Sequence, residues 1–163
     1  MNIRVVIADD HPLVRTAVAD LLGDIPAVEL VGLAADGNEA VQLALELKPD
    51  LMLLDLIMPG MSGFEALSRI NEAEPELCVI ILSMHSSEEH VLRALKLGAV
   101  GFMLKDSVAE ELEYAIQAVM SGHTWLSPGI SRSVISAYME RNVPRQESLA
   151  SRLRGRTVVD TSE

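Results

Sequence analysis

The sequence predicts an α/β protein in which helices cover both faces of a five-stranded parallel sheet, and three observations lead to this prediction. Over the first 121 residues, short apolar segments alternate five times with segments of helical periodicity. The connections between these segments are short, as in consecutive strand–helix units. The third apolar segment, residues 51–54, has no polar interruption, as expected of a central parallel strand buried on both faces. With right-handed crossovers, this pattern is typical of a doubly wound sheet.

The boundaries of each strand–helix unit follow from apolar runs and from capping residues. The predicted strands are residues 3–8, 28–34, 51–54, 79–82 and 100–104. The predicted helices, which place apolar side chains on one face, are residues 12–22, 39–47, 64–74, 88–97 and 108–120. The second helix follows a turn that starts at Asp36, and Pro49 ends it. Ser87 and Ser107 are the predicted caps of the last two helices, and Gly98 ends the first of these.

The end of the chain differs from the repeating part. Residues 1–121 are predicted to form one domain, and residues 122–141 are predicted to form a linker helix with Pro128 near its start. Beyond this helix the sequence is rich in Arg, Ser and Thr and has no sustained apolar stripe. Residues 142–163 are therefore predicted to be a flexible tail or the remnant of a linker.

Composition argues against several classes of protein. The net charge is −11, and residues 1–140 carry 8 Lys and Arg residues against 21 Asp and Glu residues, so the main body would repel nucleic acid. The single cysteine, Cys78, excludes a disulfide within the chain and is expected to be a buried thiol. The first residues do not have the layout of a signal peptide, and the apolar runs are too short to cross a membrane. A cytoplasmic protein is therefore expected.

Five polar side chains directly follow predicted strands. They are Asp9, Asp10, Asp55, Ser83 and Lys105. Ligand sites of open α/β sheets lie at the carboxyl ends of the strands, so we expect these side chains to meet at one edge of the sheet. A single acid at such a place is commonly a helix cap or a turn residue. The occurrence of all five together is what predicts a site.

The three carboxylates indicate a divalent cation. Close carboxylates repel one another and raise one another's pKa unless a cation joins them. Mg²⁺ takes one or two carboxylates together with water and phosphate oxygens, so Asp9, Asp10 and Asp55 predict a Mg²⁺ site with open positions. A carboxylate can also attack phosphorus. Asp55 could therefore accept a phosphoryl group, with Lys105 and Ser83 contacting its oxygens.

The same residues carry a resemblance to a known family. The pair Asp9-Asp10, the segment 54–63 around Asp55, Ser83 after its apolar strand and the segment 98–105 resemble the receiver domains of two-component response regulators. The likeness covers residues 3 to about 121. Four segments are similar to the NarL/FixJ branch, whose members usually carry a LuxR-type helix-turn-helix domain. They are Asp10-His11-Pro12, Ser83-Met84-His85, Lys105-Asp106 and residues 122–128.

The resemblance implies a flavodoxin-like sheet of strand order 2-1-3-4-5 and a role for each site residue. The implied phosphoacceptor is Asp55. The implied ligands of Mg²⁺, which Mn²⁺ could replace, are Asp9, Asp10, Asp55 and the backbone carbonyl of Ile57. The implied phosphoryl contacts are Ser83, Lys105 and the backbone amide of Met84. The implied switch pair is Ser83 and Phe102, and the residues that tune the lifetime of the acyl phosphate are Ile57 and His85. Ile57 cannot orient an attacking water, which predicts slow self-hydrolysis.

The resemblance also implies partners. A sensor histidine kinase would donate the phosphoryl group, and the phosphorylated chain could form a homodimer. The chain would act as a regulator and not as an enzyme, since it would catalyse only its own phosphorylation and dephosphorylation. A helix-turn-helix output domain is expected after about residue 140, and the sequence there does not show its helical pattern. This chain alone is therefore expected to bind neither specific DNA nor membranes.

The same residues argue against three other functions. A haloacid-dehalogenase-like phosphatase also uses a strand-end Asp and Mg²⁺, but it needs a second Asp two residues later, where this sequence has Ile57. An interaction module that works without phosphorylation would not need all five polar positions. A dinucleotide-binding protein needs a glycine-rich turn after its first strand, and Asp9-Asp10-His11-Pro12 contains no glycine.

Overall fold

The computed structural model describes residues 2–85, 87–130 and 132–142, and it shows an α/β protein built on one parallel sheet. The strands are β1 (Ile3–Ala8), β2 (Val28–Ala34), β3 (Leu51–Asp55), β4 (Cys78–Ser83), β5 (Gly101–Leu104) and β6 (Trp125–Leu126). The α-helices are α1 (Pro12–Gly23), α2 (Gly37–Leu47), α3 (Gly63–Ala73), α4 (Glu88–Lys96), α5 (Val108–Met120) and α6 (Arg132–Asn142). A 3₁₀ turn, η1 (Lys105–Ser107), leads into α5. The five predicted strand–helix units are confirmed to within two residues at each boundary.

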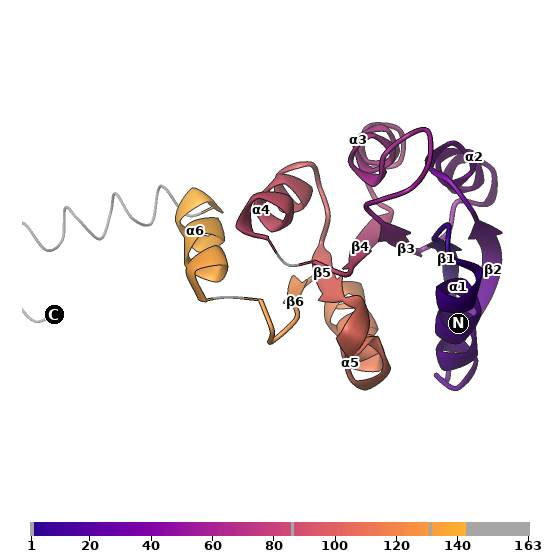
Figure 1. Cartoon of the computed structure of the whole chain (residues 1–163). Coiled ribbons are helices and arrows are strands. Elements are labelled where there is room, and N and C mark those ends of the chain that lie inside the picture. Colours follow the sequence, from indigo (N-terminus) through magenta and orange to yellow (C-terminus); the bar gives the residue numbers. More distant parts are fainter. Residues whose placement is uncertain (1, 86, 131, 143–163) are drawn as a thin grey trace, which may run out of the picture. The chain divides into compact units, whose positions relative to one another are not determined.

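The strands lie in the order β2-β1-β3-β4-β5-β6, and every neighbouring pair is parallel. The first five strands therefore have the order that the sequence implied. Figure 1 shows α2, α3 and α4 on one face of the sheet and α1 and α5 on the other. In the sheet, β2 lies on one side of β1 and β3 lies on its other side, so the chain reverses its direction across the sheet after β2. Such a reversal opens a crevice at the carboxyl ends of the strands, where open α/β sheets bind ligands.

Apolar side chains fill both spaces between the sheet and its helices. All residues of β3 are buried, since β3 lies between β1 and β4 and is covered on both faces. On the side of α1 and α5, Ile7 and Leu53 belong to one apolar cluster with Val18 and Ile116. Successive residues of a strand point to opposite faces, so Leu54 and Phe102 point toward α2, α3 and α4. The core is therefore two layers of aliphatic side chains with few aromatic ones.

Several helices begin and end as the sequence predicts. The side chain of Asp36 accepts a hydrogen bond from the Glu39 N–H at the start of α2, and Ser87 does the same for the His90 N–H at the start of α4. Ser107 occupies the cap position of α5, but its side chain makes no capping hydrogen bond. Gly98 follows α4 with a φ of +113°, and a Cβ there would lie 2.5 Å from the side chain of Asn71. Glycine is therefore favoured at this position, because other residues rarely adopt this positive φ.

The predicted count of five strands is wrong, because the sheet has a sixth strand within the predicted linker helix. Trp125 pairs with Gly101 and Leu126 pairs with Phe102 at the edge of the sheet. A strand of two residues has no periodicity that a sequence could reveal, and only its pairing with β5 defines it. Helix α6 begins at Arg132, beyond the predicted start at residue 122.

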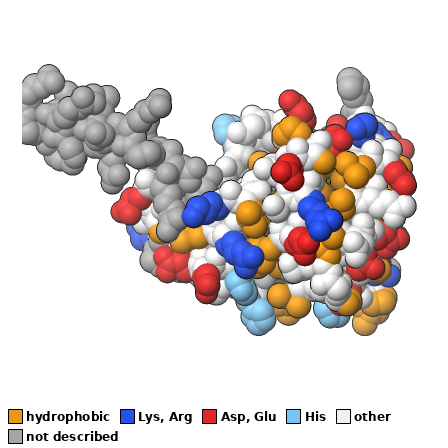
Figure 2. Space-filling view, turned by 90° about the horizontal axis from the view of Figure 1, so that it is seen from above, with side chains coloured by type: hydrophobic (Ala, Val, Ile, Leu, Met, Phe, Trp, Pro, Cys, Tyr) orange, Lys and Arg blue, Asp and Glu red, His pale blue; other side chains and the backbone are white. Residues whose placement is uncertain are grey.

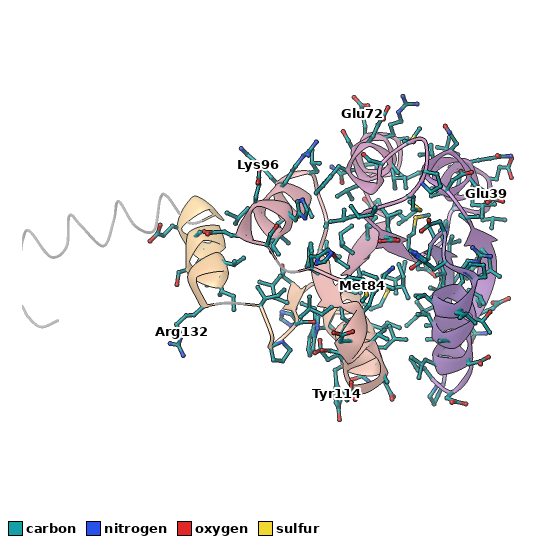
Figure 3. The ribbon with its side chains drawn as sticks, in the orientation of Figure 1. Glu39, Glu72, Met84, Lys96, Tyr114 and Arg132 are labelled. Carbon is teal, nitrogen blue, oxygen red and sulfur yellow. The ribbon has the colours of Figure 1, made fainter. Side chains whose placement is uncertain are left out.

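The chain divides into two compact units, the first ending at Gly129 and the second beginning at Ile130. Residues 143–163, most of the predicted tail, lie outside the described residues. Figure 2 shows the face covered by α2, α3 and α4, where acidic and basic side chains are interspersed. Figure 3 shows Glu72 and Lys96 pointing outward from α3 and α4. None of the helices in the described part of the chain has the length and apolar character needed to span a membrane.

Candidate functional site

The five polar side chains lie at the carboxyl ends of four neighbouring strands. Asp9 and Asp10 follow β1, Asp55 ends β3, Ser83 ends β4, and Lys105 follows β5. These strands are adjacent in the sheet in that order. The prediction that the strand ends bring these residues to one edge is therefore confirmed by the topology.

Lys105 joins two buried carboxylates. Its Nζ atom lies 2.8 Å from Oδ2 of Asp9 and 3.2 Å from Oδ2 of Asp55. The Lys105 side chain is only 7% exposed, and Asp9 is fully buried. Buried charges are stable only when they are paired, so this lysine stabilises both buried acids.

Burial and charge shift the pKa of Asp55 and of Lys105. Desolvation raises the pKa of Asp55; the charge of Lys105 opposes this, the charge of Asp9 adds to it, and the net shift is upward. Burial by itself would lower the pKa of Lys105, but its hydrogen bond to Asp9 and the charges of Asp55 and Asp9 outweigh burial and raise it. Lys105 is therefore a permanent cation, and Asp55 is a carboxylate whose charge would be stabilised by a further positive partner.

The acids fit a divalent cation. Asp9, Asp10, His11 and Asp55 each offer one ligand atom, and these atoms lie within 4.8 Å of one another. Oδ1 of Asp10 is buried, accepts no hydrogen bond from the described residues and lies 3.2 Å from Nδ1 of His11. Three neighbouring carboxylates form the donor set that hard cations prefer. His11, an exposed residue at the cap position of α1, lies within this cluster, and the sequence did not predict that place. Its position directly after Asp10 is the signal that could have revealed it.

The loop after β3 is folded tightly against Asp55. The backbone N–H of Ile57 donates a hydrogen bond of 3.2 Å to Oδ1 of Asp55, and the Gly63 N–H donates one of 2.8 Å to the Leu56 carbonyl. A Cβ on Gly63 would lie 2.3 Å from the Asp55 carbonyl oxygen and 2.5 Å from Cα of Leu56. Glycine is therefore needed here so that the start of α3 can approach the strand end.

Replacing Gly63 by alanine is expected to destabilise the chain by about 2 kcal/mol, because the backbone at Asp55 would have to move away from the new methyl group. Urea unfolding would measure this loss. Gly23→Ala is the matched control, because a Cβ at Gly23 meets nothing within 4 Å. Equal stability of the two variants would contradict the close approach.

Ser83, Met84 and His85 form the loop that faces Asp55. The Ser83 hydroxyl donates a hydrogen bond of 2.9 Å to the His85 carbonyl and accepts one of 3.1 Å from the His85 N–H. The hydroxyl is therefore engaged within its own loop. Figure 3 shows Met84, whose side chain is exposed, beyond the end of β4.

A cavity of about 180 Å³ lies at these strand ends, which is room for a small anion and water. Its lining consists of His11, Asp55, Ile57, Ser83, Met84, His85 and Lys105. The cavity thus brings together most of the predicted site residues. Phe102 is not in this lining; it is fully buried in β5, where it pairs with Ile81 of β4.

A partly buried polar network joins β5, β6 and α5, and the sequence did not predict it. The Ser127 hydroxyl donates a hydrogen bond of 2.7 Å to Oε1 of Glu111 and accepts one of 3.0 Å from the Leu104 N–H. Trp125 Nε1 donates to the same Glu111 oxygen at 3.1 Å. Leu104, which precedes Lys105, is therefore hydrogen-bonded to Ser127, the residue that follows β6.

Comparisons with known proteins identify a family for this chain. Residues 5–117 match the sequence family "response regulator receiver domain". The chain is 40% identical over 149 residues to oxygen regulatory protein NreC of Staphylococcus epidermidis, an alignment that spans 91% of this chain and 68% of that protein.

Two solved structures are similar as well. A LuxR-family two-component response regulator from Aurantimonas sp. SI85-9A1 has a TM-score of 0.79 and 34% identity, covering 86% of this chain and 100% of that one. The signal receiver domain of the response regulator NarL from Mycobacterium tuberculosis has a TM-score of 0.71 and 38% identity, covering 75% of this chain and 98% of that one. The chain therefore belongs to the response regulator receiver domain family, as a receiver domain of the NarL/NreC type in two-component signalling.

Proposed function

We propose that Asp55 accepts a phosphoryl group from a sensor histidine kinase and that this event switches the conformation of the chain to control a transcriptional output domain. One observation carries the proposal. A buried carboxylate lines a cavity, lies 3.2 Å from the Lys105 ammonium and belongs to a cluster of acids that suits a divalent cation. This combination provides a nucleophile and positive charge for the phosphoryl oxygens.

The transfer itself needs little from the protein beyond positioning. An oxygen of Asp55 attacks phosphorus, the bond from phosphorus to the donor's imidazole nitrogen breaks, and its electron pair stays on that nitrogen. The product is an acyl phosphate on Asp55. Lys105 is close enough to move from the carboxylate to the phosphoryl oxygens, and the Met84 amide and the Ser83 hydroxyl can donate hydrogen bonds to them. The donor molecule supplies the activated group.

Mg²⁺ is the proposed cofactor, with Mn²⁺ as a substitute. The proposed ligands are the carboxylates of Asp9, Asp10 and Asp55 and the backbone carbonyl of Ile57. When bound, the cation supplies positive charge to the oxygens of the transferring phosphoryl group. The upward shift in the pKa of Asp55 supports this assignment, because the charge of this carboxylate is incompletely stabilised by the chain alone.

The proposed switch links Ser83 to Phe102. The Ser83 hydroxyl must give up its hydrogen bonds with His85 before it can contact a phosphoryl group. Movement of this loop would vacate space near β4 and β5, and Phe102 would change rotamer into it. A local change in charge would then bias two arrangements of the same packing.

Residues Ile57 and His85 are proposed to tune the lifetime of the acyl phosphate. Both line the cavity, and Ile57 is 63% exposed. Ile57→Asn is expected to speed self-hydrolysis about tenfold, since one hydrogen bond that orients the attacking water is worth about 1.4 kcal/mol. Ile57→Leu is the matched control. The decay of the phosphorylated protein, followed by intact mass, would measure both, and equal decay rates would contradict the role of Ile57.

The proposal also divides the chain into a part that receives the signal and a part that connects it to an output domain. Residues 1–121 are proposed to be the signal-receiving domain, and residues 122–141 to connect it to an output domain. A phosphorylation-dependent homodimer and a cytoplasmic location belong to the same proposal. Specific DNA binding is assigned to the output domain and not to this chain, whose residues 1–140 are strongly acidic. The alignment with NreC spans 68% of that protein.

The direct test is phosphorylation by a small donor. The chain would be incubated with acetyl phosphate and Mg²⁺, and the modified peptide located by mass spectrometry. One phosphoryl group on Asp55, lost when the cation is chelated, is expected. A modification confined to another residue would contradict the assignment of Asp55, and labelling that survives chelation would contradict the role of the cation.

A further inference from the structure

We propose that Ser127 and Glu111 are positioning residues for Lys105, so that the segment after α5 contributes to phosphoryl transfer. The inference rests on the proposed phosphorylation of Asp55, and it extends the set of residues that this reaction needs beyond residues 1–121. It starts from Ser127, a fully buried polar residue that does not line the cavity at Asp55.

Ser127 differs in location from the other buried polar residues of the described chain. Those others belong to the candidate site at the strand ends: Asp9, Asp55 and Ser83. A buried polar side chain costs free energy unless it is hydrogen-bonded. The Ser127 hydroxyl donates to Oε1 of Glu111 in α5 at 2.7 Å and accepts from the Leu104 N–H of β5 at 3.0 Å. One hydroxyl group therefore joins two different elements.

These two hydrogen bonds bracket the segment that carries Lys105. Leu104 ends β5, Lys105 begins the turn η1, and α5 follows with Glu111 in its first turn. The Ser127 hydroxyl thus bonds to one residue before Lys105 and to one residue after it. The Ser127 N–H also donates to the Phe102 carbonyl at 3.1 Å, which fixes Ser127 beside β5. The backbone around Lys105 is therefore held at both ends by the same side chain.

Helix caps do not hold this segment. Neither η1 nor α5 begins with a capping hydrogen bond from a side chain, although Ser107 occupies the cap position of α5. Glu111 instead attaches the first turn of α5 to the chain around β6, which lies beside β5 at the edge of the sheet (Figure 1). Its Oε1 accepts a second hydrogen bond, of 3.1 Å, from Nε1 of Trp125. Two donors therefore fix the carboxylate that holds Ser127.

The place of Lys105 matters because its ammonium group acts at short range. Its Nζ lies 2.8 Å from Asp9 and 3.2 Å from Asp55, and the proposed reaction uses the same charge at the phosphoryl oxygens. Electrostatic stabilisation of a transition state depends on charges that are already in place, and small displacements slow the reaction. Loss of the Ser127 hydroxyl is therefore expected to slow the transfer while both the ammonium and the carboxylate remain.

The rate of phosphorylation at saturating acetyl phosphate and Mg²⁺ would test this role, with intact mass as the readout. Ser127→Ala is expected to react about fivefold more slowly than the parent, as for the loss of one hydrogen bond. Glu111→Ala is expected to show a similar loss. Glu111→Gln is expected to restore most of the rate, because its amide oxygen can still accept both hydrogen bonds. Glu113→Ala, at an exposed position of α5, is the matched control and should react like the parent.

A double-mutant cycle with Lys105→Ala separates positioning from a general defect. If Ser127 acts through Lys105, Ser127→Ala is expected to change the rate by less than about twofold once Lys105 is absent. A defect that does not involve Lys105 would lower the rate by the same factor in both backgrounds. That result would overturn the inference.

The indole of Trp125 reports directly on the state of this network. The chain has one tryptophan, so its indole N–H gives one resonance in a ¹H–¹⁵N spectrum. This resonance is expected to move in Glu111→Ala and to stay near its parent position in Ser127→Ala, where Glu111 is still present to accept. If it moves in both, Ser127→Ala has disturbed β6 as a whole, and the comparison of Glu111→Gln with Glu111→Ala decides: equal rates in these two variants would overturn the inference.

The outcomes also separate this inference from the proposed function. Phosphorylation of Asp55 at the parent rate in both Ser127→Ala and Glu111→Ala would overturn the positioning role and leave the proposed function standing. Absence of phosphorylation on Asp55 in the parent chain would overturn the proposed function and, with it, the inference.

Discussion

Asp55→Asn is expected to abolish phosphorylation of the chain by acetyl phosphate while preserving the fold. An amide is not a nucleophile toward phosphorus. Among the described residues that line the cavity, Asp55 is the one carboxylate, and it lies 3.2 Å from Nζ of Lys105. Intact mass after incubation with the donor and Mg²⁺ would show the unmodified protein. Asp20→Asn, at an exposed position of α1, is the matched control and should be phosphorylated like the parent. Full phosphorylation of Asp55→Asn would contradict the assignment.

The same variant has a second readout in stability. Burial raises the pKa of Asp55, so the folded state binds the proton of this group more tightly than the unfolded chain does. A group of this kind stabilises the fold below its unfolded pKa, and that contribution is lost as the pH rises through its folded pKa. Asparagine carries no charge at any pH. The free energy of unfolding of Asp55→Asn, relative to the parent, is therefore expected to increase in metal-free buffer as the pH rises above about 4, the usual pKa of an aspartate in an unfolded chain.

Lys105→Ala is expected to slow phosphoryl transfer at least about a hundredfold and to lower the free energy of unfolding by about 3 kcal/mol. The ammonium group pairs with Asp9 at 2.8 Å and with Asp55 at 3.2 Å. Its removal leaves two buried carboxylates without their cation, and it also removes positive charge from the phosphoryl oxygens. Rates of phosphorylation and urea unfolding would measure the two effects separately.

The loss of stability in Lys105→Ala is expected to depend on pH and on Mg²⁺ if unpaired carboxylates cause it, and a general packing defect would not depend on either. Without Lys105, whose charge lowers the pKa of Asp55, that pKa would rise further. The folded state would then bind more protons than the unfolded chain, and stability would fall as the pH rises. The destabilisation is therefore expected to be smaller near pH 4 than near pH 7, and smaller with saturating Mg²⁺. Lys96→Ala, at an exposed position of α4, is the matched control (Figure 3). A loss that is the same at every pH would contradict the electrostatic explanation.

Much of the fold could be predicted because the signals are local. The five strand–helix units follow from runs of apolar residues and from turn residues, and even the caps at Asp36 and Ser87 are visible in the sequence. The sixth strand could not be predicted, since Trp125 and Leu126 become a strand only through pairing with Gly101 and Phe102. The start of α6 was misplaced for the same reason.

The polar positions of the site were also predictable, because strand ends of a parallel sheet share one edge. The sequence could not predict their contacts. Nζ of Lys105 lies closer to Asp9 than to Asp55, and this difference depends on where β5 and β1 end relative to one another in the sheet. The engagement of the Ser83 hydroxyl with His85 depends on the local loop conformation. The turn of the His11 ring toward Asp9 and Asp10 depends on how α1 starts.

The sequence by itself determined the α/β class, the five repeating units and the identity of the acids, the hydroxyl and the lysine at the strand ends. These features depend on residue type and on spacing along the chain, so they can be predicted without knowing how distant segments pack. Only the tertiary structure decided which atoms meet: the Lys105 bridge, the cavity at Asp55, the approach of Gly63 and the place of His11 among the acids. Distances between elements far apart in the chain depend on packing of the whole sheet, and packing is not a property of any one segment.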